Sequence, residues 1–394
     1  MAKLLVDGVD GIITNYPDRL RALAEARGLR LPRRYAAPFD VQAHRGGRAT
    51  RPENTLAAFR NALADPDIST LELDTGVSSD GVLVISHDRA VNGAHCQDTA
   101  PVRPGDPQFP YTGKLIHELS LAQLRTLDCG SRTTMPAQVP VPGEPMATLA
   151  ELFDLVRASG RTDIRLNIET KISPLVADTE PYQLFTRRLV GAVQRAGLTR
   201  RVTVQSFDWR TIRLAHQLDP RLATVALVWQ YGPAECATLA DECSLRAVAG
   251  DPSVVSPWTD GLDWWRMPDL GALVRATGAT TVSANWQVHD PDQGTVVDGD
   301  WYRRQSPGHR RAAPARPPRG GAVHRERRAD HGAGDQPGGR RHHHRRSGPA
   351  DPGGPAGRPA VGNGRRRPQG GHREHLVNGV RRVRQGRTTG VGAS

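Results

Sequence analysis

Two short apolar runs carry charged side chains at alternate positions. Glu72 and Asp74 lie two residues apart in one run, and Glu169 lies two residues before Lys171 in the other. On a strand this spacing places both side chains on the same face. Three inward carboxylates would repel one another and suffer a large desolvation cost unless a cation joined them, and hard oxygen ligands favour Ca²⁺ or Mg²⁺. The spacing agrees equally well with acids that face solvent and pair with arginines.

Two histidines end further strand-like runs. His44 is followed by Arg45, and His87 is followed by Asp88. Active sites of parallel barrels lie at the carboxyl ends of the strands, so both histidines are in suitable places. A pair of histidines near a metal cluster suits general acid and base catalysis, and an adjacent arginine suits a phosphate ester. The sequence does not assign the two roles between the histidines.

These side chains need a frame of alternating strands and helices. Strand-like runs cover residues 41–44, 70–74, 82–87, 164–171, 202–207, 224–229 and 281–286, and helical periodicity covers 56–63, 149–158, 184–196 and 209–217. The alternation predicts a closed parallel barrel or a doubly wound sheet. A polar, Pro-rich stretch from 88 to 147 is too long for a simple connection, which indicates an insertion or a lid.

Charge is distributed unevenly along the chain. The formal net charge is +12, but residues 303–394 hold 22 Arg, no Lys and five acidic residues, so this segment carries +17 and the remainder −5. The segment has no Phe, Trp, Tyr or Ile and is rich in Gly and Pro, so we expect disorder there. Neither a transmembrane run nor an export signal is visible, and we expect a cytoplasmic protein.

Four cysteines, Cys96, Cys129, Cys236 and Cys243, lack the Cys-x-x-Cys spacing of a zinc site. Two disulfides would suit an exported protein. Because no export signal is visible, we expect free thiols instead.

Seven short motifs together resemble the glycerophosphodiester phosphodiesterase family, in order and in spacing. They are His44-Arg45-Gly46, Pro52-Glu53-Asn54-Thr55 with Ala58-Phe59, Glu72-Leu73-Asp74, Asp80-Gly81, His87-Asp88, Ile168-Glu169-Thr170-Lys171 and Ser206-Phe207. The resemblance implies a (β/α)8 TIM barrel of the kind shared with phosphatidylinositol-specific phospholipases C. It also implies a divalent cation, Ca²⁺ or Mg²⁺, and hydrolysis of a small-molecule glycerophosphodiester to glycerol 3-phosphate and an alcohol.

The resemblance also implies roles for individual residues. The metal ligands would be Glu72, Asp74 and Glu169, the general base and acid would be His44 and His87, Arg45 would contact the phosphate, and Lys171 would add positive charge near the developing oxyanion. Glu53 is not assigned a catalytic role, because its motif opens a helix. An acid in the first turn of a helix favours the helix dipole without any catalytic role, and we expect this structural role for Glu53.

Both ends of the chain depart from the family pattern. Family members usually finish with an aromatic-Thr-Val-Asn strand, a helix, and then Gly-Val-Asp-Gly-Ile-Ile-Thr-Asp followed by Pro. This chain starts with a similar run, from Gly8 to Thr14, followed by Asn15, Tyr16 and Pro17. Residues 1–35 would then be a copy of the family's last strand and helix. The copy either closes the barrel, as in a circular permutant, or is a remnant of a preceding gene copy.

The tail can be read as an out-of-frame product. Residues 339–344, Gly-Arg-Arg-His-His-His, can be encoded by codons that, read one base later, spell Val-Asp-Gly-Ile-Ile-Thr, and residues 323–327 can likewise shift to Tyr-Thr-Val-Asn-Asp. We infer a frameshift near Tyr302, which leaves a phosphodiesterase domain over 39–302 that is incomplete at its last strands. An incomplete barrel exposes unpaired backbone edges.

Three functions follow from these observations. The first is metal-dependent hydrolysis of glycerophosphodiesters, with or without a loss of activity caused by the missing last strands of the barrel. The second is phospholipase action on lysolipids by the same site, which a preference for long acyl chains would reveal. The third is an inactive, Arg-rich product that binds nucleic acid non-specifically through its tail; we expect no specific nucleic-acid partner. Deleting residues 303–394 should spare phosphodiesterase activity and abolish nucleic-acid binding.

Overall fold

Eight strands form one closed ring. The computed structural model describes residues 1–6, 8–31, 39–248, 251, 253–285, 288–291, 294–297 and 378–382, the last range as backbone only. The order around the ring is β2 (Asp40–Ala43), β1 (Gly11–Thr14), β11 (Asn378–Arg382), β10 (Thr281–Asn285), β9 (Ala223–Val228), β8 (Val202–Ser206), β7 (Arg165–Thr170) and β3 (Thr70–Val77). Because β3 pairs back with β2, the doubly wound alternative is wrong and the predicted barrel is confirmed.

Seven of these strands run parallel, and helices connect them as in a (β/α) barrel. The helices are α1 (Ala2–Val6), α2 (Pro17–Glu25), α3 (Leu56–Ala64), α5 (Leu149–Ala158), α6 (Tyr182–Arg195), α7 (Trp209–Leu218) and α8 (Leu270–Arg275), with 3₁₀ turns η4 (Leu239–Asp241), η5 (Pro257–Thr259) and η6 (Trp264–Arg266) before α8. Within the described residues, no helix has the length and apolar character needed to cross a bilayer.

The strand β3 is buried along its whole length. All eight residues of this strand are buried, as expected for a parallel strand that is covered on both sides. Its Leu71 and Leu73 share one apolar cluster with Phe59 of α3, Leu152 of α5 and Phe185 of α6. Every one of these five side chains is fully buried, so β3 is held rigidly where the candidate carboxylates project from it.

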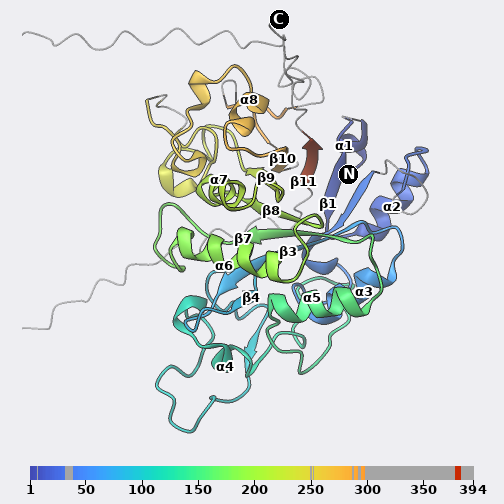
Figure 1. The fold of residues 1–394 in the computed structure, drawn as a ribbon, viewed down its shortest axis with the longest axis vertical. Helices are drawn as coiled ribbons and strands as arrows, with labels where there is room; N and C mark the ends of the chain where they lie inside the picture. Colours follow the sequence, from blue (N-terminus) through green and yellow to red (C-terminus); the bar gives the residue numbers. More distant parts are fainter. Residues whose placement is uncertain are drawn as a thin grey trace, which may run out of the picture. The chain divides into compact units, whose positions relative to one another are not determined.

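The ring closes through segments from the two ends of the chain. β1 pairs in parallel with β2, at the position proposed for the lost final strand. β11 lies between β1 and β10 and runs antiparallel to both, as Figure 1 shows with β11 in dark red. We expected an incomplete barrel and a disordered tail; within the described residues, the backbone of residues 378–382 occupies the gap between β1 and β10. The unpaired edges of β1 and β10 offer backbone donors and acceptors to a strand of either direction.

The remainder of the tail, with the codon pattern behind the frameshift hypothesis, lies outside the described residues. β11 belongs to the same compact unit as residues 1–313. The other unit, residues 314–372, also lies outside the described residues.

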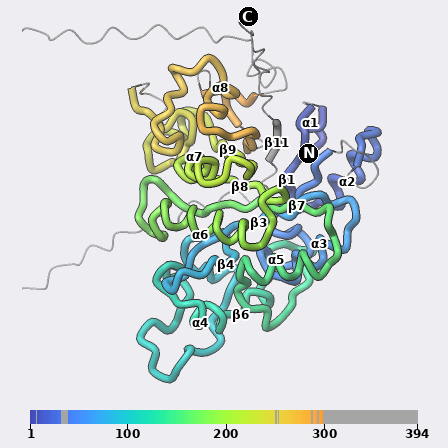
Figure 2. Tube along the Cα trace, viewed as in Figure 1, coloured from blue at the N-terminus to red at the C-terminus, as the bar shows by residue number. Residues whose placement is uncertain are grey.

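The predicted insertion has secondary structure and a small core of its own. It follows β4 (Leu83–Ile85), which pairs antiparallel with β3 outside the ring, so the run 82–87 is not a barrel strand as expected. The insertion contains β5 (Gln97–Asp98), η3 (Ile116–Glu118), α4 (Leu121–Leu124) and β6 (Leu127–Asp128). In Figure 2 this teal part of the chain, with α4 and β6, extends beyond β4. Buried Tyr111, Leu119 and Leu124 belong to its apolar cluster.

All four cysteines form disulfides. Cys96 bonds to Cys129 across the insertion, and Cys236 bonds to Cys243 in the loop that follows β9. The expectation of free thiols is therefore wrong. It rested on the missing export signal, whereas the pairing of β5 with β6 brings together two cysteines that are 33 residues apart in the sequence.

Candidate active site

Three carboxylates meet between the middle of β3 and the carboxyl end of β7. Asp74 is the register partner of Glu169 on the neighbouring strand, and Glu72 lies two residues earlier on the same face of β3. One carboxylate oxygen from each residue lies within 4.8 Å of the other two, and all three residues are buried. The alternative that these acids face solvent is therefore wrong. The structure brings together the three predicted metal ligands.

Their surroundings oppose simultaneous ionisation of the three acids. Burial, followed by the charge of Asp74, raises the pKa of Glu72 well above its usual value. Burial also raises the pKa of Glu169 to about 7. Burial acts in the same direction on Asp74, but Lys171 and Arg45 outweigh it and hold the pKa of that carboxyl low. A divalent cation would compensate the charge that protons must otherwise neutralise, so this oxygen-donor set fits Ca²⁺ or Mg²⁺.

A layer of amide side chains inside the barrel holds Glu72. Gln205 of β8 donates from Nε2 to Glu72 Oε1 at 2.7 Å, and the backbone N–H of Arg45 donates to Oε2 at 2.8 Å. Asn167 of β7 donates from Nδ2 to Gln42 Oε1 at 3.0 Å and to Gln205 Oε1 at 2.8 Å. These amides were not among the predicted site residues. Their signal was a polar residue within an otherwise apolar strand-like run.

Two cationic side chains border the carboxylates. Arg45 has φ 50° and ψ 38°, in the left-handed region, and its Nε lies 3.2 Å from Asp74 Oδ2. The Nζ of Lys171 lies 2.8 Å from Glu169 Oε1 and 3.5 Å from Asp74 Oδ1. A non-Gly residue in this backbone region is uncommon and costs on the order of 1 kcal/mol or more. The fold therefore fixes positive charge beside the triad at an energetic cost.

Glu53 anchors one of these cations. Its carboxylate lies 2.7 Å from Arg45 Nη1, 2.7 Å from Arg48 Nε and 3.6 Å from His95 Nε2. The residue is buried, and the N-cap of α3 is Thr55, with no acidic residue in the first turn. The expected helix-start role is therefore wrong. A buried carboxylate needs charged partners, and the spacing in sequence did not reveal them.

His44 begins the turn that follows β2, as predicted. Its Nδ1 lies 2.5 Å from Oδ1 of Asn15, and its Nε2 lies 3.9 Å from Glu72 Oε2. Burial, followed by the charge of Arg45, lowers the pKa of His44 well below its usual value, which favours the neutral form of the ring. The segment that contains Asn15 resembles the last strand and helix of the family, but its sequence did not predict this contact.

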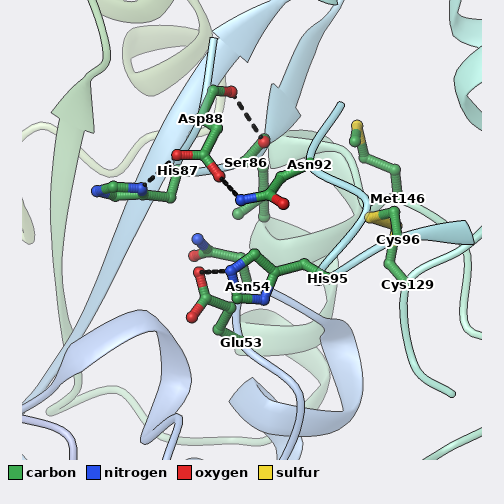
Figure 3. Close-up of a pocket in the computed structure, with 11 residues that line it drawn as sticks. Glu53, Asn54, Ser86, His87, Asp88, Asn92, His95, Cys96, Cys129 and Met146 are labelled. Carbon is green, nitrogen blue, oxygen red and sulfur yellow. Dashed lines mark hydrogen bonds and ion pairs between the residues drawn. A yellow bond between two sulfur atoms is a disulfide. The ribbon is translucent and has the colours of Figure 1, made fainter. Parts of the chain in front are cut away.

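His87 follows β4 and lies at the edge of a pocket. Its Nδ1 contacts Asp88 Oδ1 at 3.0 Å, and Asp88 Oδ2 accepts a hydrogen bond of 2.6 Å from Asn92. Figure 3 shows the Asp88 carboxylate between His87 and Asn92, and the His95 ring beside Glu53. The pocket is lined by Glu53, Asn54, Ile85, Ser86, His87, Asp88, Asn92, His95, Cys96, Cys129 and Met146. The insertion thus supplies part of the pocket wall near His87.

Comparisons with known proteins agree with this geometry. The model of the Glycerophosphoryl diester phosphodiesterase family matches residues 44–290. The chain is similar to the glycerophosphodiester phosphodiesterase of Caldanaerobacter subterraneus subsp. tengcongensis, with 29% identity over 195 residues, 50% of this chain and 68% of the relative. It is also similar to the lysophospholipase D GDPD3 of Mus musculus, with 43% identity over 61 residues, 16% of this chain and 18% of the relative.

A solved structure gives a weaker likeness. The Oleispira antarctica phosphodiesterase in complex with the product sn-glycerol-3-phosphate is 25% identical, and the match covers 48% of this chain and 66% of that one with a TM-score of 0.37. This overlap adds no argument of its own. The family model, by contrast, spans more than half of the sequence. The chain therefore belongs to the glycerophosphoryl diester phosphodiesterase family.

Proposed function

We propose that this chain hydrolyses glycerophosphodiesters to glycerol 3-phosphate and an alcohol, with a divalent cation held by Glu72, Asp74 and Glu169. The observation that carries the proposal is the buried carboxylate triad beside Arg45 and Lys171. A phosphodiester anion resists nucleophiles until its charge is neutralised and its leaving oxygen receives a proton. The site offers groups for both tasks.

Charge neutralisation falls to the cations of the site. When bound, Ca²⁺ or Mg²⁺ would act as a Lewis acid on a phosphoryl oxygen. Arg45, which Glu53 and Asp74 hold in place through ion pairs, would contact the phosphate. Lys171 would add positive charge from the end of β7, where its ammonium lies beside Glu169.

The two histidines would carry the proton transfers. His44 suits the general base, because its neutral ring directs Nε2 toward the triad. His87 suits the general acid, because Asp88 contacts its Nδ1 and orients the ring at the edge of the pocket.

The test is cation-dependent release of glycerol 3-phosphate from glycerophosphocholine by the purified full chain. We expect activity that EDTA removes, that added Ca²⁺ or Mg²⁺ restores, and that His44→Ala and Glu72→Ala both lose. Lysophosphatidylcholine serves as a second substrate, because the short match to a lysophospholipase D favours a lysolipid as the next candidate. Absence of hydrolysis of either substrate by folded protein would overturn the proposal.

We further propose that the protein acts in an oxidising compartment, in place of the expected cytoplasm. The two disulfides support this placement, since such bonds persist mainly in oxidising environments. Titration of free thiols in protein purified without reductant tests the point. Four reactive thiols would contradict it.

A further inference from the structure

Asn15 reaches His44 from a part of the chain that lies outside the family match. The match begins at residue 44, whereas Asn15 immediately follows β1. Its Oδ1 lies 2.5 Å from His44 Nδ1, and both side chains are buried, with exposures of 2% and 6%. Two buried polar groups at this distance form a hydrogen bond, so the N-terminal segment touches a residue of the proposed mechanism.

The register of the barrel dictates this contact. Thr14 pairs with Ala43 in the parallel ladder of β1 and β2, so the next residues, Asn15 and His44, leave the two strands side by side. The backbone holds Asn15 in place, because its carbonyl accepts a hydrogen bond of 3.1 Å from Ala49 N–H. The N–H of Tyr16 donates to Thr14 Oγ1 at 3.1 Å and tightens the same turn.

The contact also defines the state of the imidazole ring. A carboxamide oxygen only accepts hydrogen bonds, so Nδ1 must carry the proton. In a neutral ring the other nitrogen, Nε2, then has a free lone pair. Since Nε2 lies 3.9 Å from Glu72 Oε2, that lone pair is on the side of the carboxylate triad.

We propose that Asn15 is a positioning residue that holds His44 in the Nδ1–H tautomer, with the Nε2 lone pair directed at the triad. The first strand and turn of the chain thereby contribute to the active site. The effect on catalysis rests on the proposed phosphodiesterase function, whereas the tautomer does not.

Three variants test the catalytic side. Asn15→Ala removes the acceptor, and we expect kcat to fall about 10- to 100-fold with KM unchanged, as for loss of partners that orient catalytic or metal-bound histidines. Asn15→Asp keeps an oxygen acceptor at the same place and should retain more of kcat than Asn15→Ala. Ile12→Ala is the matched control, because Ile12 is a fully buried residue of β1 that packs in the apolar cluster with Val41 and lies on the opposite face of the strand from Ile13. A kcat for Asn15→Ala equal to that of the wild type would overturn the proposal.

The tautomer is measured independently of activity. In the ¹⁵N spectrum of histidine-labelled protein, with His44→Ala used to assign the signals, we expect the Nδ1–H form in the wild type and a mixture of forms in Asn15→Ala. A wild-type ring in the Nε2–H form would overturn the proposal. If the Nδ1–H form is found in a protein that hydrolyses no diester, the positioning role stands and the proposed function fails, so the two failures are distinguishable.

Discussion

The barrel has two arcs that are built in different ways. The site arc consists of β2, β3, β7 and β8, which come from one stretch of the chain, run parallel and carry the carboxylates and amides of the interior. The closing arc consists of β9, β10, β11 and β1, and β11 runs antiparallel to both of its neighbours. Chemistry requires particular side chains in a fixed register. Closure requires only backbone hydrogen bonds, which a strand of either direction provides.

The largest expected effect is on the site arc. Glu72→Gln removes one charge of the triad while keeping its hydrogen bond from Gln205, and we expect phosphodiesterase activity to fall by on the order of 10³-fold. Calorimetry should show weaker Ca²⁺ or Mg²⁺ binding in the same variant. Glu118→Gln, at an exposed position of the insertion, is the matched control. Unchanged cation affinity in Glu72→Gln would break the assignment of chemistry to this arc.

Within the closing arc, a change in β11 should act on stability instead. Val380→Pro removes a backbone donor from the middle of β11, which pairs on both sides, and we expect a loss of about 1–3 kcal/mol in the free energy of unfolding. Val380→Ala, which keeps the N–H, is the control. Urea denaturation measures both variants. Equal midpoints would show that β11 does not close the ring and would revive the incomplete barrel.

A smaller effect is expected at Glu53, which lies between β2 and α3 and supports the site arc. Glu53→Gln weakens the ion pairs that fix Arg45 and Arg48, so we expect KM for glycerophosphocholine to rise roughly 10-fold, in line with the loss of supporting contacts around a site. Steady-state kinetics provide the measurement. A KM equal to that of the wild type would mean that Arg45 needs no anchor.

The smallest effect concerns pH. Glu169 has a folded pKa of about 7 against an ordinary value of 4.5, so in this window the folded state binds more protons than the unfolded state. Stability of the metal-free protein should therefore fall as pH rises from 4.5 to about 7. Melting temperatures in EDTA should show this slope, and saturating Ca²⁺ or Mg²⁺ should remove it. Glu169→Gln should reduce the slope, and the raised pKa of Glu72 should account for the part that remains; an unchanged slope in this variant would assign the titration to another group.

Much of the site arc could be predicted from local patterns. The run 202–207 corresponds to β8, and the predicted helix 149–158 is α5 (Leu149–Ala158), because periodicity and turn residues act over short distances. The closing arc could not be predicted in this way. β11 lies in a segment rich in Arg and Gly with no apolar period, and its partners are remote in the sequence.

The site was predictable to the same extent. Motifs identified Glu72, Asp74 and Glu169, which the structure brings together, whereas their catalytic roles stay predictions. The partners that orient these groups required the tertiary fold. Asn15 meets His44 only through the register of β1 with β2, and Glu53 meets Arg45 only because the turn after β2 lies against the segment that precedes α3.

The antiparallel strand β11 also has a consequence for folding kinetics. Gly11 pairs with Val380, so the last ring contact joins residues from opposite ends of the sequence. Contacts with such large sequence separation form slowly, because a long loop must close before they stabilise anything. While β11 is absent, β1 and β10 expose free edges that can pair with other chains. Aggregation during refolding should thus depend on protein concentration, and a chaperone that shields these edges should raise the yield.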